Sequence, residues 1–563
     1  MTAKTIYAIT LAAAMVTITG CATDSSKDGI FDPRTLGDPQ RTAAREVTSV
    51  PLRPLPTTLQ SQFLPDDNGR PSNIKEPPVK SALAPDNRVY RLPLREIAQR
   101  TVANNLNVKV SGFAPAIEET RVTEAEARFD PEVFANATYT AARDPGNGQF
   151  SGANSDTIGL ETGLRQLLPS GGQVELSYRP AHINLEDTAT SNNTLWTSGL
   201  QLQLTQPLLR DFGNDVNQAR IVINRLNQRI SVLDFRKDLE EAVRTVEEVY
   251  WRLVQAEQNK VITENLLQRT IDTADLLARR RGQDVTLEQI SNSVSRIEST
   301  RNDLIRARQR VNDLSDQLKA LMNDPDYPTA GNQLLLPADK PLETGISFEL
   351  TDSINSALLN RFDLAQQQLR VDSAGVALNV AKNNKLPQLN FVGSIGRTGL
   401  GEDFSSASEN GFNSSSDISW SAGLQFSQKI GNREANAIYR RAQLQRMQAI
   451  TQYQQLIENA TLEVKIAQRE VETSYESIVQ VRAAKFAAAK ALEVIEILER
   501  GGEALVPRFV ESKLNRQQDL AQSERTEADA IATYNIAIAT LEQRKGTLLR
   551  YNNIVLDEKS LQK

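Results

Sequence analysis

The sequence has few of the side chains that usually carry catalysis or bind metal ions. It contains one cysteine, Cys21, and one histidine, His182. A single cysteine excludes a disulfide bond within the chain, and two such residues far apart make neither a metal site nor a nucleophile pair. The sequence also lacks a GxxxxGK[ST] phosphate loop and an HExxH zinc motif. We therefore predict no catalytic residues, no cofactor and no bound metal, and an enzyme is the least favoured class.

Aromatic side chains are also scarce, and there is no excess of positive charge. Aromatic residues make up 5% of the 563 residues, hydrophobic residues 39%, and the mean hydropathy is -0.41. Long helices that expose much of their surface have such a composition. The formal net charge of -6 provides no basic surface for nucleic acid, so we expect no nucleic-acid partner.

The first 20 residues predict a secretory signal peptide. One lysine is followed by an apolar run that is too short to span a membrane. The stretch Ile18-Thr19-Gly20-Cys21 resembles the bacterial lipobox, which implies that Cys21 is lipidated. The next residue, Ala22, is not the aspartate that retains lipoproteins in the inner membrane, so an anchor in outer-membrane lipid is favoured. The alternative is an ordinary signal peptide with an incidental cysteine.

Residues 21–93 predict a proline-rich linker. Ten of the 23 prolines lie between Pro33 and Pro85. Proline removes backbone donors and disfavours helix around itself, so this segment is either an extended spacer or a strap along the folded body.

The rest of the chain contains two copies of one plan, at residues 94–323 and 350–550. Leu94 aligns with Leu350 and Pro131 with Pro387 without a gap, and in both copies a proline ends a helical pattern. An inter-repeat linker at 324–349 and a tail at 551–563 complete the predicted organisation.

Alternating segments follow the prolines. Between Ile418 and Ser427 every even position is apolar, and residues 200–205 alternate in the same way. Such strands have one apolar face, which suits either a sandwich or a transmembrane barrel. Residues 159–179 predict an additional hairpin that turns at Pro-Ser-Gly-Gly, and the Gly-, Ser- and Asn-rich segments at 186–194 and 396–417 predict exposed loops.

Long helices follow the strands. No proline occurs from Asn214 to Met322 or from Asn432 to Val506, and the apolar positions are spaced at three and four. A strict interval of seven, which is typical of coiled coils, joins Ile290, Ile297, Leu304, Val311 and Leu318. Glycine-containing breaks near 279–286 and 499–507 divide each helical region into a hairpin.

Over residues 94–550 this order of features resembles the TolC-type outer-membrane factors. The resemblance rests on the duplication, the proline-ended helix before each strand, and the passage from Gln-Pro-Leu-Leu to Gly-Asn at 206–214. It implies a mainly α fold with a transmembrane β-barrel, in which a homotrimer builds a long α-helical barrel. Each chain would add four strands to one shared twelve-stranded outer-membrane barrel.

The resemblance also implies a function, partners and a location. The protein would be the exit duct of a tripartite efflux or type I secretion system, gated at its periplasmic tip. Its partners would be a periplasmic adaptor and an inner-membrane transporter. The alternatives are a periplasmic adaptor and a structural coiled-coil lipoprotein of the cell envelope, although an adaptor normally has one helical hairpin and a coiled-coil lipoprotein needs no amphipathic strands.

Ten positions are implied as functional by the same resemblance. Gly213, Asn214, Gly431 and Asn432 would mark the transitions from strand to helix. The candidate adaptor contacts at the helix tips are Gly282, Gln283, Gly502 and Glu503, although the residues after each glycine depart from the family's tip motif.

Arg508 and Glu511 are the candidate periplasmic gate. They align with two positions that are acidic in the family, and only Glu511 keeps the acid. Three copies around one axis would place alternating charges at the tip. The alternative is that both are ordinary surface charges at the start of a helix.

Overall fold

The structure is a computed structural model, and all the residues that it describes lie in the second of two units, Met1–Thr48 and Ser49–Lys563. The predicted signal peptide, Cys21 and the proline-rich segment up to residue 88 are outside the described part. The described residues are 89–143, 154–186, 193–280, 285–413, 418–501 and 506–554.

The helical pattern that opens the first repeat is interrupted twice. It forms α2 (Leu94–Asn104), α3 (Leu106–Ser111) and α4 (Phe113–Glu126), with the 3-10 turn η2 (Ala127–Phe129) after them. Asn105 lies outside the helices at ψ 128°, and its side-chain oxygen accepts hydrogen bonds from the backbone N–H of Asn107 and Val108. An asparagine that satisfies free N–H groups in this way starts a new helix, so one uninterrupted helix is not formed.

The second repeat has a break at the corresponding place. It opens with α8 (Leu350–Asn360) and α9 (Phe362–Asn383), separated by Arg361 at ψ 126°. Leu106 and Phe362, which align in the sequence, are the first residues of α3 and α9. The duplication therefore includes the position of the break.

Six antiparallel strands form one sheet in the order β2-β3-β4-β5-β7-β8. The expected four strands per chain are therefore wrong for this sequence, because the additional hairpin joins the sheet as β3 and β4 instead of standing apart from it. The strands are β2 (Glu132–Arg143), β3 (Asn154–Leu167), β4 (Gln173–Glu186), β5 (Asn193–Pro207), β7 (Gln388–Gly401) and β8 (Ile418–Ser427).

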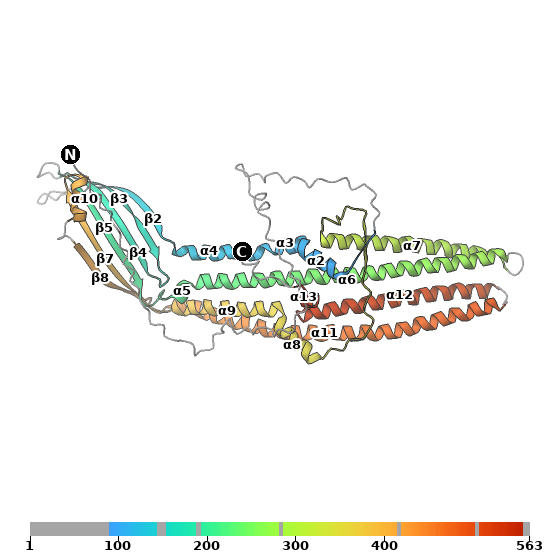
Figure 1. The fold of residues 1–563 in the computed structure, drawn as a ribbon. Coiled ribbons are helices and arrows are strands. Elements are labelled where there is room, and N and C mark those ends of the chain that lie inside the picture. Colours follow the sequence, from blue (N-terminus) through green and yellow to red (C-terminus); the bar gives the residue numbers. More distant parts are fainter. Residues whose placement is uncertain are drawn as a thin grey trace, which may run out of the picture. The chain divides into compact units, whose positions relative to one another are not determined.

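The long helices pair as two hairpins, α6 with α7 and α11 with α12 (Figure 1). Four of the five predicted heptad positions of α7 are confirmed as core positions, since Ile297, Leu304, Val311 and Leu318 are buried, and Ile290 is partly buried. Thr286 caps α7 in a reciprocal capping box with Gln289. The helices are α5 (Asn214–Asn217), α6 (Ala219–Arg279), α7 (Leu287–Met322), α11 (Arg433–Arg500) and α12 (Pro507–Arg544).

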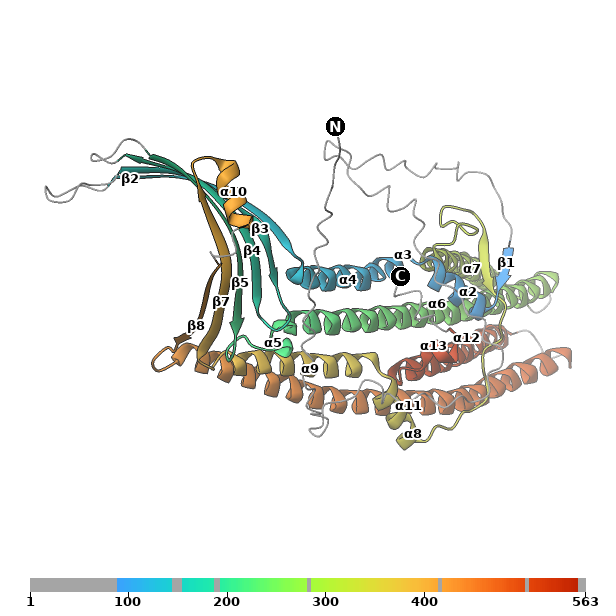
Figure 2. The ribbon, with the colours of Figure 1, turned by 60° about the vertical axis from the view of Figure 1, so that its left-hand side comes forward.

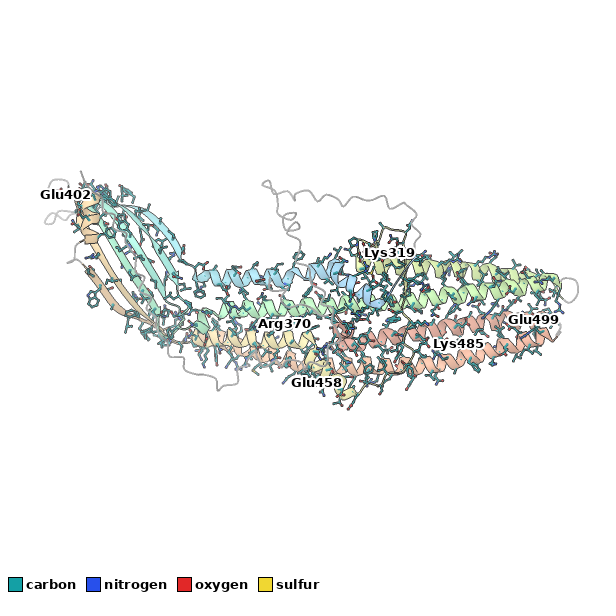
Figure 3. All side chains as sticks on the ribbon, in the orientation of Figure 1. Lys319, Arg370, Glu402, Glu458, Lys485 and Glu499 are labelled. Carbon is teal, nitrogen blue, oxygen red and sulfur yellow. The ribbon has the colours of Figure 1, made fainter. Side chains whose placement is uncertain are left out.

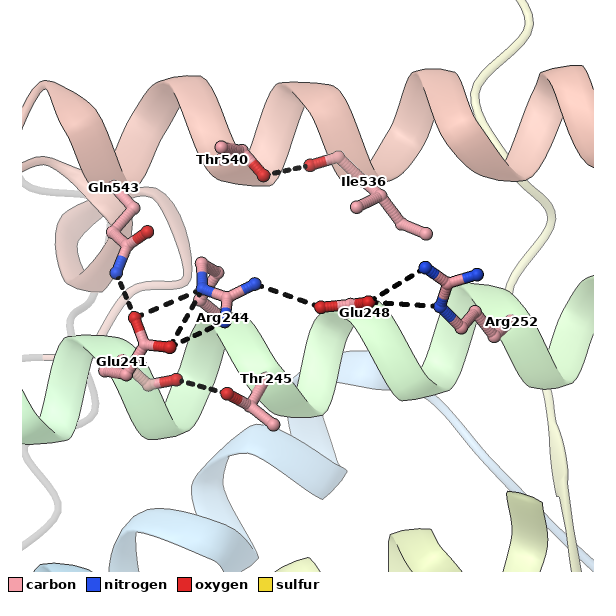
Figure 4. Close-up of polar contacts among 8 residues, drawn as sticks. All are labelled: Glu241, Arg244, Thr245, Glu248, Arg252, Ile536, Thr540 and Gln543. Atoms are coloured by element: carbon pink, nitrogen blue, oxygen red, sulfur yellow. Dashed lines mark hydrogen bonds and ion pairs between the residues drawn. The ribbon is translucent and has the colours of Figure 1, made fainter. Parts of the chain in front are cut away.

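The two hairpins meet where α12 packs against α6. On this side of α6 a ladder of charges runs along the helix: Glu241 binds Arg244 at 2.6 Å, Arg244 binds Glu248 at 3.0 Å, and Glu248 binds Arg252 at 2.9 Å. Gln543 of α12 donates a hydrogen bond to Glu241, which joins the ladder to the second hairpin (Figure 4). Partly exposed pairs three and four residues apart stabilise a helix by only a few tenths of a kcal/mol each, about 0.3–0.5, so the apolar core carries most of this packing.

Two short segments, one from each predicted linker, pair with each other over the buried core of α6 and α7. β1 (Val89–Leu92) is parallel to β6 (Leu334–Pro337), so the last residues of the proline-rich segment are paired with the inter-repeat linker. Tyr250 of α6 is fully buried beneath them. Its hydroxyl accepts hydrogen bonds from the backbone N–H of Ala338 and Asp339 at 3.2 and 3.0 Å and lies 3.1 Å from a carboxylate oxygen of Asp339. These contacts favour the strap interpretation for residues 89–92.

A second tyrosine holds the other end of the inter-repeat linker. Tyr534 of α12 is fully buried, donates a hydrogen bond to the Thr344 carbonyl at 2.9 Å and accepts one from the Ile346 N–H at 3.1 Å. The linker is therefore fixed to both hairpins by buried phenols.

The short helix α13 (Leu548–Tyr551) follows α12 and packs back on α6. Leu548 and Ile554 belong to the buried cluster that also contains Phe235 and Leu239 of α6. Ile554, in the predicted C-terminal tail, is thus part of the core. Among the described residues, no helix combines the length and the apolar character needed to cross a bilayer.

Candidate functional site

One face of the six-stranded sheet is apolar over its full width. Register pairs Val133 with Leu164, Leu176 with Leu202, and Ile395 with Trp420. Because paired residues point to the same side of a sheet, these side chains form one continuous surface. In this row it faces no core in the described part: Val133 is 74% exposed and Trp420 75%.

The opposite face is polar and carries charge. Arg165 of β3 binds Glu132 of β2 at 2.8 Å, and Arg179 of β4 binds Glu161 of β3 at 2.6 Å. Arg179 also contacts Gln201 of β5. Of the two interpretations left open by the alternating pattern, an exposed apolar face with charges behind it fits a transmembrane wall, whose apolar side faces lipid and whose polar side faces water.

Both transitions from sheet to long helix contain residues with positive φ. Gly213 has φ 100° before α5, and Asn432 has φ 39° before α11, preceded by Gly431 at φ 80°. Asn214 is the first residue of α5. Glycine and asparagine adopt this region at the lowest cost, so the Gly-Asn pairs allow the chain to turn from strand to helix.

Residues 353–547 match the family model described as outer membrane efflux protein. The second repeat is an outer membrane efflux protein domain. A comparison with curated proteins gives no significant match.

Solved structures of outer-membrane channels share the fold of the efflux-protein domain and of the repeat before it. The outer-membrane channel OprN matches with a TM-score of 0.59 at 15% identity, over 81% of this chain and 90% of that one. VceC of Vibrio cholerae matches at 0.57 and 15% over 80% and 96%, and CmeC of Campylobacter jejuni at 0.57 and 14% over 83% and 90%. At these identities the likeness establishes the fold.

The helix α10 (Phe404–Asn413) lies within the matched range 353–547, and the sequence did not reveal it. Segment 396–417 predicted a loop, yet its first residues end β7 and α10 packs on β7 and β5 (Figure 2). A side chain at Gly399 would lie 2.2 Å from the backbone of α10, so only glycine permits this approach.

Aromatic contacts place α10 on the apolar face. Phe412 stacks on Tyr178 of β4 with ring centroids 5.9 Å apart, and Phe404 meets Trp196 of β5 at 5.7 Å. Tyr178 pairs with Leu200, and Trp196 pairs with His182, on the side of the sheet that also presents Leu202. The spacing of Phe404, Ala407 and Gly411 was the signal in the sequence, but the serines and the asparagine between them masked it.

The tips of the helical hairpins are only partly described. Gly282, Gln283, Gly502 and Glu503 lie in segments 281–284 and 502–505, outside the described residues. Arg508 and Glu511 are exposed on the first turn of α12, and within the described part neither has an ion-pair partner. The structure of one chain therefore does not bring these two side chains into a pair.

A buried ion pair next to the tip was not predicted. Lys513 of α12 donates to both carboxylate oxygens of Glu499 on α11, at 2.8 and 2.7 Å, and the two side chains are 9% and 17% exposed. Figure 3 shows Glu499 near the tip end of α11. The two charges are 14 residues apart in the sequence, and only the hairpin turn brings them together.

Removing one charge of this pair is expected to loosen the tip. In Glu499→Gln the ammonium of Lys513 stays buried without a countercharge, which costs about 3 kcal/mol. Hydrogen exchange of the last turns of α11 should therefore become much faster. Glu493→Gln, in an exposed pair with Lys490 on the same helix, is the control and should leave exchange unchanged. Equal exchange in the two variants would mean that the buried pair does not hold the tip.

The part of the chain that the structure describes holds no group of three or more His, Cys, Asp or Glu side chains arranged to bind a metal ion.

Proposed function

We propose that this protein is the outer-membrane exit duct of a tripartite efflux or type I secretion system. The observation that carries the proposal is the two-faced sheet joined directly to two long helical hairpins. Such a sheet needs lipid on one side and water on the other, and the helices extend from it for roughly 90–100 Å at 1.5 Å per residue. A wall in the outer membrane and a tunnel across the periplasm account for both parts.

The working unit would be a homotrimer, joined at its tip to a periplasmic adaptor and through it to an inner-membrane transporter. Export energy would come from that transporter, because the duct only conducts. Lipidation of Cys21 would add an anchor in the outer membrane. The efflux-protein domain in the second repeat supports this assignment over the adaptor and the structural lipoprotein.

Arg508 and Glu511 would form the gate of the closed trimer. Their exposure in a single chain leaves both side chains available to neighbouring copies around a three-fold axis. Alternating positive and negative charges would hold the tip closed, and docking of the adaptor would separate them.

Purification from detergent-solubilised outer membrane, followed by native mass and single-channel conductance, tests the proposed function. A trimer with a small and mostly closed conductance is expected. A soluble or monomeric protein without conductance would contradict the duct and favour an adaptor or a structural lipoprotein.

The gate is tested separately by Arg508→Asp. A ring containing only acidic side chains repels itself, so the open fraction should rise several-fold. Arg516→Asp makes the same charge change on α12, two turns farther from the tip, and serves as the control. If both variants conduct like the unmodified protein, Arg508 does not gate the channel.

A further inference from the structure

We propose that three copies of this chain close one shared barrel of eighteen strands, six from each copy, through pairing of β8 of one copy with β2 of the next. The trimer rests on the proposed function, whereas the strand number and the pairing edges rest on the sheet itself. The partner that the sheet edges fit is a second copy of this chain.

The additional hairpin is part of the membrane wall. β3 and β4 are 14 residues each and pair along their lengths with β2 and β5. A transmembrane strand needs about 9–11 residues. Leu160, Leu164 and Leu176 face the same side as Val133 and are 39–48% exposed. The hairpin therefore meets lipid with the same alternation as the other four strands.

The turn of this hairpin is fixed at the helical end of the sheet. The Gly213 N–H donates to the Ser170 carbonyl at 3.0 Å, and the Ser170 hydroxyl contacts the side chain of Gln206 at 3.0 Å. Gly171, at φ 90°, touches the backbone of Asp211 so closely that a side chain would lie 2.2 Å from it. The hairpin is thus held in the wall where β5 passes into α5.

Both edges of the sheet are open among the described residues. There β2 and β8 each pair on one side only, and all ten residues of β8 are exposed. Unpaired backbone groups in hydrocarbon cost several kcal/mol each, so a lipid-facing sheet of this kind must close with other strands.

The two edges are complementary to each other. β2 starts at the helical end of the sheet and β8 ends there, so β8 of one copy and β2 of a neighbour would run antiparallel. Even positions of β8 and odd positions of β2 carry the apolar face. Closure without stagger would place Trp420 in the row of Val133. A stagger of six residues brings the helical ends of the two strands level and places Trp420 opposite Tyr139 and Ala422 opposite Ala137, with the apolar face continuous.

An eighteen-stranded barrel is wider than a twelve-stranded one. Barrel diameter grows roughly in proportion to strand number, so the increase is about 1.5-fold. Barrels of about 16–18 strands enclose a water-filled channel. The hairpin adds strands but no helix, so the outer opening gains width while the helical tunnel does not. The outer opening is therefore wider relative to the helical tunnel that leads to it than in a barrel of twelve strands.

Cysteine pairs at the edges test the pairing. Ala137→Cys is combined in one chain with Ile418→Cys, Ala422→Cys or Leu424→Cys, which together allow for stagger between the two strands. Directly opposite side chains lie about 4.5–5.5 Å apart, within reach of a disulfide. Oxidation in isolated outer membranes should give covalent trimers with at least one combination. Ala137→Cys with Ser421→Cys, whose second cysteine lies on the polar face, is the matched control and should give none.

The native mass of the same oxidised protein distinguishes a failure of the strand pairing from a failure of the proposed duct function. A trimer that forms no covalent link with any apolar-face combination overturns the β8–β2 pairing and leaves the duct intact. A covalent dimer with a native mass of two copies overturns the eighteen strands in favour of twelve. A monomer without conductance overturns the duct as well.

Deletion of residues 147–189, which removes β3 and β4, tests the width. β2 and β5 run in opposite directions, so their direct joining preserves the alternation of strands. Gln425→Cys places a thiol on the polar face in both proteins. In the full chain this thiol should react with larger maleimide-polyethylene glycols than in the chain without β3 and β4. The same size limit in both proteins would overturn the wide exit.

Discussion

Alanine at Tyr250 is expected to lower the free energy of unfolding by about 3–5 kcal/mol, as for other large buried aromatic side chains. The ring is fully buried among Val246, Leu318 and Leu335, and it packs edge-on against Trp251 with centroids 5.2 Å apart. Its removal leaves a cavity between α6, α7 and β6. The midpoint of chemical denaturation, followed by the helical circular dichroism signal, measures the loss.

Tyr250→Phe distinguishes the contribution of the hydroxyl to stability from that of the ring. Tyr250→Phe keeps the packing but leaves the N–H groups of Ala338 and Asp339 without their acceptor, which costs about 1–2 kcal/mol. The inter-repeat linker should then be cleaved faster in limited proteolysis, while the helices stay folded. If Tyr250→Ala and Tyr250→Phe destabilise equally, the hydroxyl and not the ring carries the effect.

The stability of the helical part is expected to fall as the pH rises from 5 to 8. Burial raises the pKa of Glu240 and of Glu247 to about 7 in the folded chain, from 4.5. Glu240 accepts a hydrogen bond from the Leu548 N–H at 3.2 Å, and Glu247 accepts one from the side chain of Asn552. Both carboxyl groups therefore lie beneath the segment that contains α13.

The direction of this change in stability follows from the order in which the folded and unfolded chains ionise. Below pH 4.5 both carboxyl groups are protonated whether the chain is folded or unfolded, and their contribution is fully present. As the pH rises, the unfolded chain ionises first, and the contribution is lost progressively up to a pH near 7. At about 1.4 kcal/mol per pKa unit, each group accounts for up to about 3 kcal/mol.

The double variant Glu240→Gln with Glu247→Gln should flatten this dependence. Glutamine keeps an oxygen for the Leu548 N–H but carries no charge at any pH. Denaturation midpoints at pH 5, 7 and 8 should converge in the double variant and diverge in the unmodified protein. Glu458→Gln, at an exposed position of α11, controls for the loss of negative charge. An unchanged slope in the double variant would contradict the role of the two buried groups.

Strong periodicity made parts of this fold predictable from the sequence. The alternation from Ile418 to Ser427 matches the bounds of β8, and the interval of seven identified the buried positions of α7. In both cases one face of an element is uniformly apolar, and the period alone fixes which residues share it.

Features that depend on contacts distant in sequence were not predictable. α10 forms because glycines in β7 let its backbone approach the sheet, and its own serines and glycine disfavour helix. The pairing of Glu499 with Lys513 depends on the geometry of a hairpin turn. The sequence predicted the additional hairpin but not that it joins the sheet, because strand pairing decides which strands a sheet contains. The predicted number of strands per chain was therefore wrong.

The break at Asn105 lies between these cases. A side chain that caps the next helix is a local signal, and asparagine is a strong one. The continuous apolar pattern on either side of it concealed the interruption. Arg361, at the matching position of the second repeat, carries no such cap and is held instead by ion pairs with Asp363 and Glu463.

The open edges β2 and β8 also bear on how the protein reaches its membrane. A chain whose wall is complete only when neighbours supply the missing strands gains little by entering lipid alone. Insertion would then be a collective step whose rate rises steeply with the amount of newly secreted chain. A cell that makes few copies would keep them waiting in the periplasm, where factors that shield exposed strand edges would set the yield of finished channels.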